Sequence, residues 1–283
     1  MDISIADALR EAVESLRAAG VGEPRLEASL LLSHTIGRDR AFLIAHDDSM
    51  VSSEQAQNFA SSVSRRAAGE PLQYITRHQE FFKLDFEVTP DVLIPRPETE
   101  IIVEAALDLL PSDAEFGFAD VGTGSGCIAI SILHERPRSQ ATALDQSPRA
   151  LAIAERNAKR YELANRLRLV QSDLFRGLAA SDRFDLIVSN PPYIPDGELS
   201  SLQREVQREP RTALAGGADG LDLIRRLVKE ASEHLTSGGF LIFEFGINQD
   251  GEIRELVDKA IWELIEIRRD LQQIPRTIIL RKK

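Results

Sequence analysis

The stretch FGFADVGTGSG, residues 116–126, decides the fold of this chain. Its first six residues are mostly apolar and predict a buried strand, and the glycines that follow predict a tight turn opening a helix near residues 127–135. Gly122, Gly124 and Gly126 let the backbone approach a bound molecule where a Cβ atom would clash, and the N–H groups at a helix start attract polar ligands. The stretch therefore predicts a strand–loop–helix unit that binds a small polar ligand.

The same alternation of strand and helix continues to the end of the chain. Apolar segments predict strands at 116–121, 141–145, 166–170, 184–190, 239–245, 262–268 and 276–281, and helical periodicity predicts helices near 127–135, 148–161, 221–235 and 251–260. Such alternation produces a mostly parallel sheet with helices on both faces. We therefore expect an α/β fold in this part of the chain.

The residues before this region predict a different architecture. From Ile3 to about Gly69, apolar residues recur at helical spacing between glycine- and proline-containing breaks, which predicts a small bundle of four or five helices. The alternating run EFFKLDFEV, between Gln79 and Val88, predicts a β-hairpin. A chain of 283 residues is long enough for a large and a small domain. We expect a helical domain at 1–75, a hairpin linker at 76–90 and an α/β domain at 91–283.

Composition limits the partners and the location. No window approaches the roughly 20 apolar residues of a membrane helix, and the N-terminus lacks the basic and apolar regions of an export signal. The single cysteine, Cys127, cannot form an internal disulfide or a metal cluster, which suits a reducing cytosol. A formal net charge of -11 disfavours non-specific nucleic-acid binding. We expect a cytoplasmic protein without a membrane, a metal ion or a nucleic acid as a direct partner.

Two acidic residues follow the strands beside the glycine loop. Asp145 ends the next strand, about twenty residues after the loop, where it could accept hydrogen bonds from the ribose of either a dinucleotide or S-adenosylmethionine. Spacing alone does not separate these two ligands, and a helix cap is the structural alternative for Asp145. Asp173 follows the third strand and could meet an adenine amino group, with Leu174 and Phe175 as apolar walls, although an ordinary turn explains Asp173 equally well.

The segment Asn190-Pro191-Pro192-Tyr193 stands directly after the apolar strand FDLIVS. Two adjacent prolines remove two backbone donors and hold the chain extended, so the carbonyls of Asn190 and Pro191 can point at a ligand. The Asn190 side chain both donates and accepts hydrogen bonds, which matches a planar carboxamide or an aromatic amino group. A loop without function is the alternative, but the position at a strand end beside the glycine loop favours a substrate site.

Together, DVGTGSG and NPPY resemble the class I S-adenosylmethionine-dependent methyltransferases that act on nitrogens conjugated to a planar system. LIPRPETE at 93–100, EPRTALAGGADGLDLIRR at 209–226 and IPRTIIL near the C-terminus are similar to motifs of the release-factor glutamine methyltransferase family, and the resemblance covers the whole chain. The chain departs from the family pattern at two positions. Leu174 stands where an aromatic residue would follow Asp173, and Gln146 follows Asp145 where a hydrophobic residue is usual.

The resemblance implies a Rossmann-like, mostly parallel seven-stranded methyltransferase sheet with a helical N-terminal domain. Because every candidate chemical residue lies after Leu93, we expect this helical domain to dock the substrate. The resemblance also implies transfer of a methyl group from S-adenosylmethionine to the N5 atom of the glutamine in the Gly-Gly-Gln motif of peptide chain release factors, which modulates translation termination. Asn190 and Pro191 would be catalytic, and Asn190, Pro191, Pro192 and Tyr193 would bind the substrate. The implied cofactor-binding residues are Gly122, Thr123, Gly124, Ser125, Gly126, Asp145, Asp173, Leu174 and Asn190.

Three other functions remain open at this point. Methylation of adenine N6 in nucleic acid uses the same amino-group chemistry, but the charge of -11 argues against it. Methylation of a ribosomal-protein glutamine is distinguished by the PRPE segment at 95–98. A non-catalytic cofactor-binding protein would not need Asn190.

Overall fold

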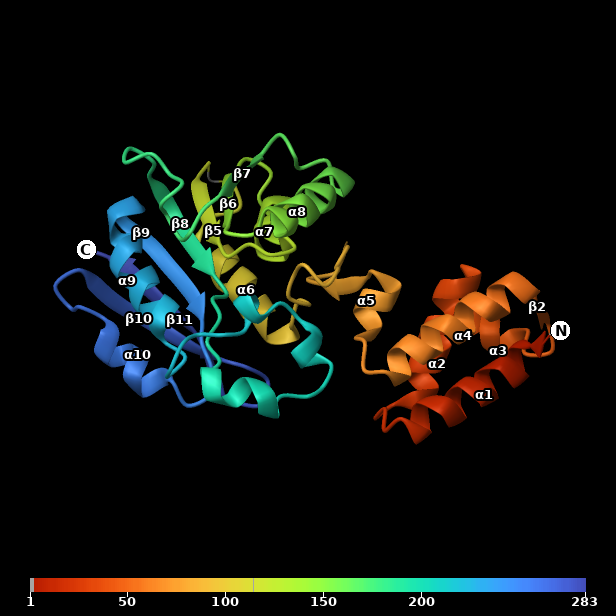
Figure 1. Ribbon diagram of the computed structural model, residues 1–283. Coiled ribbons are helices and arrows are strands. Elements are labelled where there is room, and N and C mark those ends of the chain that lie inside the picture. Colours follow the sequence, from red (N-terminus) through yellow and green to blue (C-terminus); the bar gives the residue numbers. More distant parts are fainter. Residues whose placement is uncertain (1–2, 114) are drawn as a thin grey trace. The chain divides into compact units, whose positions relative to one another are not determined.

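The computed structural model describes residues 3–113 and 115–283, which form two compact units. One unit contains the chain up to His78 together with Gln203–Arg208, and the other contains Gln79–Leu202 and Glu209–Lys283. Most helices and strands of both units are labelled in Figure 1. None of the helices in the described part of the chain combines the length and apolarity needed to cross a bilayer.

The first unit is a helical bundle. Its elements are α1 (Ile5–Ala18), α2 (Pro24–Ile36), α3 (Arg40–Ala45), α4 (Ser53–Ala67) and α5 (Leu72–Thr76), with the two short strands β1 (Ile3–Ser4) and β2 (Met50–Val51) paired antiparallel. Leu16, Leu31 and Leu32 are fully buried at its centre. Ser52 begins α4 with a capping box, in which its side chain and that of Gln55 satisfy each other's backbone N–H groups. The bundle predicted from apolar periodicity is thereby confirmed.

A buried arginine ties the segment Gln203–Arg208 into this bundle. Arg66 on α4 is 6% exposed and binds Glu27 on α2 through two guanidinium nitrogens. Its Nη1 also donates to Glu205 at 2.8 Å. One cation therefore neutralises two carboxylates, which the loss of that cation would leave facing each other.

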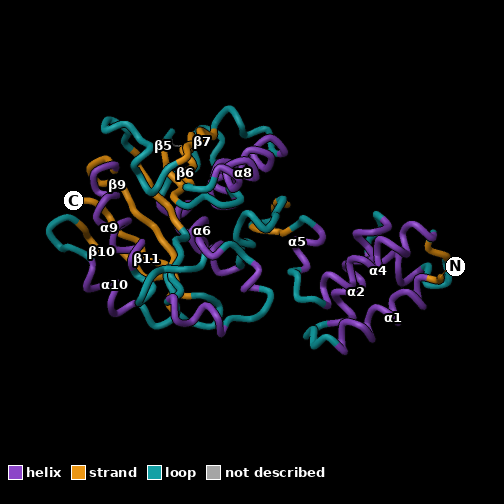
Figure 2. Tube along the Cα trace, in the orientation of Figure 1, coloured by secondary structure: helices purple, strands orange, loops and turns teal. Residues whose placement is uncertain are grey.

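The second unit contains the large sheet (orange strands in Figure 2). Within the described residues its seven strands are β5 (Gly117–Val121), β6 (Gln140–Asp145), β7 (Leu167–Gln171), β8 (Phe184–Ser189), β9 (Leu235–Glu244), β10 (Trp262–Arg269) and β11 (Pro275–Lys282), in the order β10-β11-β9-β8-β5-β6-β7. All neighbours are parallel except β11, which runs antiparallel to β9 and β10. The predicted Rossmann-like, mostly parallel sheet is confirmed. The predicted hairpin is also present, as β3 (Gln79–Phe81) and β4 (Leu84–Phe86).

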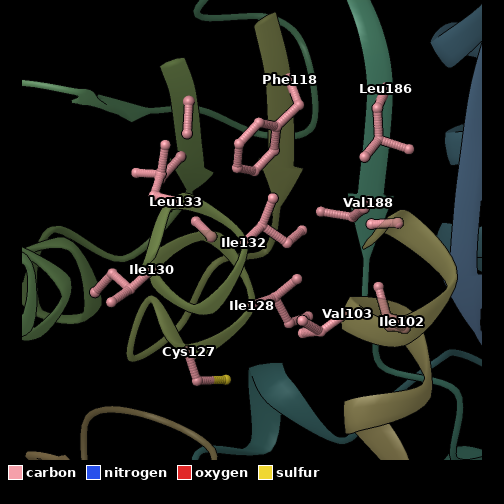
Figure 3. Close-up of a cluster of buried hydrophobic side chains, with 14 of the residues drawn as sticks. Ile102, Val103, Phe118, Cys127, Ile128, Ile130, Ile132, Leu133, Leu186 and Val188 are labelled. Atoms are coloured by element: carbon pink, nitrogen blue, oxygen red, sulfur yellow. The ribbon is translucent and has the colours of Figure 1, made fainter. Parts of the chain in front are cut away.

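Side-chain alternation along the strands divides the core of this unit into two layers. Phe118, Leu186 and Val188 face the layer that contains α6 (Glu100–Leu109) and α7 (Cys127–Glu135), as Figure 3 shows. The Ala158 side chain of α8 (Pro148–Arg160) belongs to the same layer. Strand residues that point to the other face of the sheet, such as Ile187, pack against α9 (Asp222–His234) and α10 (Asp250–Leu256). Helices thus cover both faces, which explains the continuous apolar runs of the central strands.

One boundary differs from the sequence-based expectation. The helix expected around 251–260 ends at Leu256, because the Asp258 side chain accepts a hydrogen bond from Ala260 N and the Asp258 carbonyl accepts from Ile261 and Trp262. This local turn replaces the last helical turn and starts β10. It does not affect the edge of the sheet where the glycine loop lies.

Two neighbouring arginines on α4 provide a matched test of the buried ion pair. We expect Arg66→Met to lower the free energy of unfolding of the helical unit by about 3 kcal/mol, because it leaves the partly buried Glu27 without its guanidinium partner and Glu205 with Arg204 alone. Arg65→Met should cost less than about 1 kcal/mol, because Arg65 forms one exposed pair with Glu70. Urea unfolding followed by circular dichroism measures both values. Equal losses for the two variants would contradict the role assigned to Arg66.

Candidate functional site

A pocket lies at the carboxyl ends of β5, β6 and β8, where the strand order reverses between β5 and β8. Ligands of open α/β sheets bind at such reversals, because the connecting segments leave toward opposite faces and open a crevice. The pocket is lined by Gly122, Thr123, Gly124, Ser125, Asp145, Asp173, Leu174, Asn190, Pro191 and Pro192, together with Thr99 and residues of the 91–95 and 210–213 segments. Most of the predicted site residues, from four separate segments, therefore line one pocket. Gly126 and Tyr193 lie just outside its wall.

The glycine loop has the shape of a ligand cradle. Gly122 and Gly124 have φ of +75° and +55°, and a Cβ built on either would meet no protein atom within 4 Å. Since both residues line the pocket, such a Cβ would occupy space where a ligand can approach the backbone. Asn157 holds the loop from behind, donating through Nδ2 to the Ser125 carbonyl at 2.8 Å. The loop thus leaves room for a ligand to approach its backbone at Gly122 and Gly124.

Asp120 supports the loop from inside the core. Its side chain is fully buried, and Oδ2 accepts hydrogen bonds from Thr123 Oγ1 at 2.6 Å and from Ala129 N at 3.3 Å. Oδ1 has no partner among the described residues. Burial raises the pKa of the Asp120 carboxyl to about 7, because neither the two hydrogen bonds nor any nearby cation offsets the loss of hydration.

Asp145 lines the pocket, and its carboxylate accepts hydrogen bonds from two backbone N–H groups. Its Oδ2 accepts from Gly124 N and its Oδ1 from Ser147 N, both at 2.9 Å. Ser147, and not Asp145, caps α8, by accepting from Ala150 N. Burial raises the pKa of Asp145, while these two hydrogen bonds oppose the rise. Asp145 therefore braces the glycine loop, and its contact with a ribose stays a prediction.

The residues that the sequence analysis assigned to adenine lie only in part on the pocket wall. Asp173 lines the pocket and forms ion pairs with Arg226 and Arg176. Leu174 also lines the pocket, with φ of +50°. That turn of the backbone directs Phe175 into the core, where its ring stacks on His234 with the ring centroids 5.0 Å apart. The expectation that Phe175 forms a pocket wall is wrong.

The Asn190–Tyr193 segment is held by buried polar side chains that the sequence did not single out. Asn190 Nδ2 donates to Thr99 Oγ1 at 2.9 Å, and the Thr99 hydroxyl donates to Glu244 Oε2 at 2.7 Å. The Tyr193 hydroxyl donates to Glu244 Oε1 at 3.0 Å. Burial raises the pKa values of both Glu244 and Tyr193. The signal for Glu244 was present in the sequence, as the one charged residue of the apolar run GFLIFEF.

Two further contacts explain the motifs on either side of the pocket. Glu209 accepts hydrogen bonds from Ile94 N and from the Arg96 guanidinium, and so joins the 93–100 motif to the 209–226 motif. Gly220 has φ of +81°, and a Cβ there would lie 2.2 Å from the Tyr193 carbonyl oxygen. Only glycine allows this loop to pack against the NPPY segment.

Cys127 is the one cysteine of the chain and lines the pocket. Burial raises the pKa of its thiol to about 12. A thiol with such a pKa is not ionised at neutral pH and is a poor nucleophile. Cys127 is therefore poorly suited to act as a nucleophile in this pocket.

Comparisons with known proteins agree with this geometry. The family model described as PrmC N-terminal domain matches residues 7–76, and the model described as Methyltransferase small domain matches residues 100–218. The chain is 41% identical to the release factor glutamine methyltransferase of Koribacter versatilis, over 99% of both chains. It is 45% identical to that of Moorella thermoacetica, over 90% of this chain and 89% of the relative. A methyltransferase from Pyrococcus furiosus shares the fold, with a TM-score of 0.54 at 20% identity over 79% of this chain and 98% of that one.

Asp120→Asn tests the buried carboxyl through the pH dependence of stability. The folded-state pKa is raised, so the stability that Asp120 contributes is fully present at low pH and is lost as the pH rises from 3.8 to about 7. Asparagine does not titrate, so the stability of the variant relative to the parent should increase across this window, by up to roughly 4 kcal/mol. Urea unfolding at a series of pH values measures the difference. A difference independent of pH would show that the carboxyl titrates normally.

Proposed function

Because this chain belongs to the release factor glutamine methyltransferase family, we propose that it methylates the N5 side-chain nitrogen of the glutamine in the Gly-Gly-Gln motif of a peptide chain release factor. The observation that carries the proposal is the position of Asn190 and Pro191 beside the glycine loop, in one pocket. A glutamine amide entering at Asn190 would lie next to the group bound at the loop. We also propose that the enzyme acts in the cytoplasm, where release factors work.

The residues present fit S-adenosylmethionine, the cofactor of this family, which supplies a methyl group activated by a sulfonium. Gly122 and Gly124 leave room for the part of the cofactor that would lie against the loop backbone. Asp145 would offer carboxylate oxygens to a ribose, and Asp173 and Leu174 would offer a polar and an apolar contact to adenine. Each of these contacts is a proposal about a side chain that lines the pocket. They would hold the methyl donor in the same pocket as Asn190.

Asn190 and Pro191 would orient the acceptor. An amide nitrogen is a weak nucleophile because its lone pair is delocalised into the carbonyl, so alignment contributes much of the rate. The Asn190 Oδ1 and the Pro191 carbonyl oxygen would accept hydrogen bonds from the two N–H groups of the glutamine amide. These hydrogen bonds would direct the amide nitrogen at the methyl group and stabilise the positive charge that develops on that nitrogen. The methylated nitrogen is strongly acidic and loses its proton to water. A strong base is therefore not required, and none lies in the NPPY segment.

The direct test is mass spectrometry of a release factor incubated with the enzyme and isotopically labelled S-adenosylmethionine. We expect one labelled methyl group on the glutamine of the Gly-Gly-Gln motif. A release factor with that glutamine replaced by asparagine is the matched control and should remain unlabelled. Label on another residue, or on adenine in nucleic acid, would refute the proposed substrate.

The same assay tests the role of Asn190. Asn190→Ala should lower turnover by about 10²-fold or more, because the acceptor is no longer aligned. The affinity for S-adenosylmethionine, measured by calorimetry, should stay within a few-fold, since the glycine loop is intact. An unchanged single-turnover rate combined with lost cofactor binding would assign Asn190 to the cofactor instead.

We further propose that the helical domain, residues 1–75, docks the release factor. The proposed chemical residues all lie after Leu93, and a single loop glutamine offers few contacts by which to recognise a protein. Binding energy from a remote surface can supply that recognition and position the reacting amide.

A variant that lacks residues 1–73 tests this docking role. It should still bind S-adenosylmethionine but should methylate the whole release factor poorly, while its activity on a short Gly-Gly-Gln peptide changes less. Calorimetry gives the affinity for S-adenosylmethionine, and the methylation assay gives the turnover of the whole release factor and of the peptide. Undiminished turnover of the whole release factor would mean that the helical domain serves another purpose.

A further inference from the structure

The hydrogen bonds behind Asn190 have a defined direction. Glu244 lies at the end of β9, is 1% exposed and, when ionised, can only accept hydrogen bonds. The hydroxyls of Thr99 and Tyr193 donate to its two oxygens. The Thr99 proton is thereby committed to Glu244, so toward Asn190 the Thr99 oxygen can only accept.

This direction determines which end of the Asn190 carboxamide faces Thr99. Only the Nδ2 end can donate to the Thr99 oxygen, and it does so at 2.9 Å. The opposite end, Oδ1, remains available as an acceptor on a side chain that lines the pocket. In the flipped orientation Oδ1 would face an oxygen that has no proton to give, and a donor would face the incoming amide N–H. Both contacts would then be unfavourable.

We propose that Thr99 and Glu244 are positioning residues, which orient the Asn190 carboxamide so that its oxygen is presented to the glutamine N–H. The inference rests on the proposed function, because it concerns how the acceptor nitrogen is held. Thr99 is 2% exposed and precedes α6, so its hydroxyl has little freedom to turn elsewhere. The 93–100 motif thus contributes Thr99 to the site.

The surroundings of Glu244 are consistent with its role as an acceptor. Burial raises the pKa of Glu244, and the hydrogen bonds from Thr99 and Tyr193 and the positive charge of Arg276 oppose that rise. Glu98 is the nearby carboxylate that adds to it. The two hydroxyl donors favour the ionised carboxylate, in which both oxygens accept.

The test compares three substitutions of buried threonines in the full-length enzyme. Thr99→Val removes both hydrogen bonds at nearly constant volume and should lower kcat for a release factor by roughly tenfold or more. KM for the release factor and the Kd of S-adenosylmethionine should change less than about threefold, because neither ligand depends on Thr99 for its main contacts. Thr99→Ser keeps the hydroxyl and should retain most of kcat.

Thr277→Val is the matched control. Thr277 is fully buried and lies opposite Glu244 in the register of β11 and β9. Its hydroxyl has no hydrogen-bond partner in the part of the chain that the structure describes. Its replacement should leave kcat unchanged. An equal fall in kcat for Thr277→Val and Thr99→Val would assign the effect to packing and overturn the inference.

A double-mutant cycle distinguishes an effect of Thr99 through the Asn190 carboxamide from an effect that is independent of Asn190. If Thr99 acts through Asn190, adding Thr99→Val to Asn190→Ala should produce no further fall in the single-turnover rate. A full additional fall in the Asn190→Ala background would overturn the inference, as would a Thr99→Val enzyme as active as the parent. Thermal unfolding of each variant identifies any rate loss that comes from instability. Absence of methylation by the parent enzyme would instead refute the proposed function, on which the inference rests.

Discussion

The reversal of strand order between β5 and β8 is the constraint on which the site depends. Because α7 covers one face of the sheet after β5 and α9 covers the other after β8, the carboxyl ends of these strands open into a crevice. The glycine loop follows β5, and Asn190 follows β8. Two segments separated by more than sixty residues are thereby brought into one pocket.

Buried titratable groups lie behind this pocket and hold its walls. Asp120 supports the glycine loop, Glu244 holds the NPPY segment, and Glu209 joins the 93–100 motif to the 209–226 motif. The groups that we propose to face the substrate are the Asn190 carboxamide and the Pro191 carbonyl, which line the pocket. This separation suits a reaction that needs alignment of a weak nucleophile more than a strong base. Mutations behind the pocket should therefore alter rate through geometry as well as through stability.

The segment that follows NPPY is divided between the two units. Residues 203–208 cluster with the bundle and are held there by Arg66, whereas Glu209 belongs to the sheet-containing unit and binds Arg96. A short stretch of chain is thus anchored at both of its ends by ion pairs in different units.

The sequence by itself determined the strand and helix order, the glycine loop and the family, because apolar periodicity, glycine spacing and motifs such as NPPY are local properties of the chain. It also assigned Asn190, Asp145 and Asp173 to strand ends, where a parallel sheet must gather them. Only the tertiary structure decided that Phe175 turns into the core and that Thr99 and Glu244 stand behind Asn190. These contacts join residues up to 145 positions apart, and the direction of their hydrogen bonds depends on burial and on the position of each donor. No local pattern encodes such a geometry.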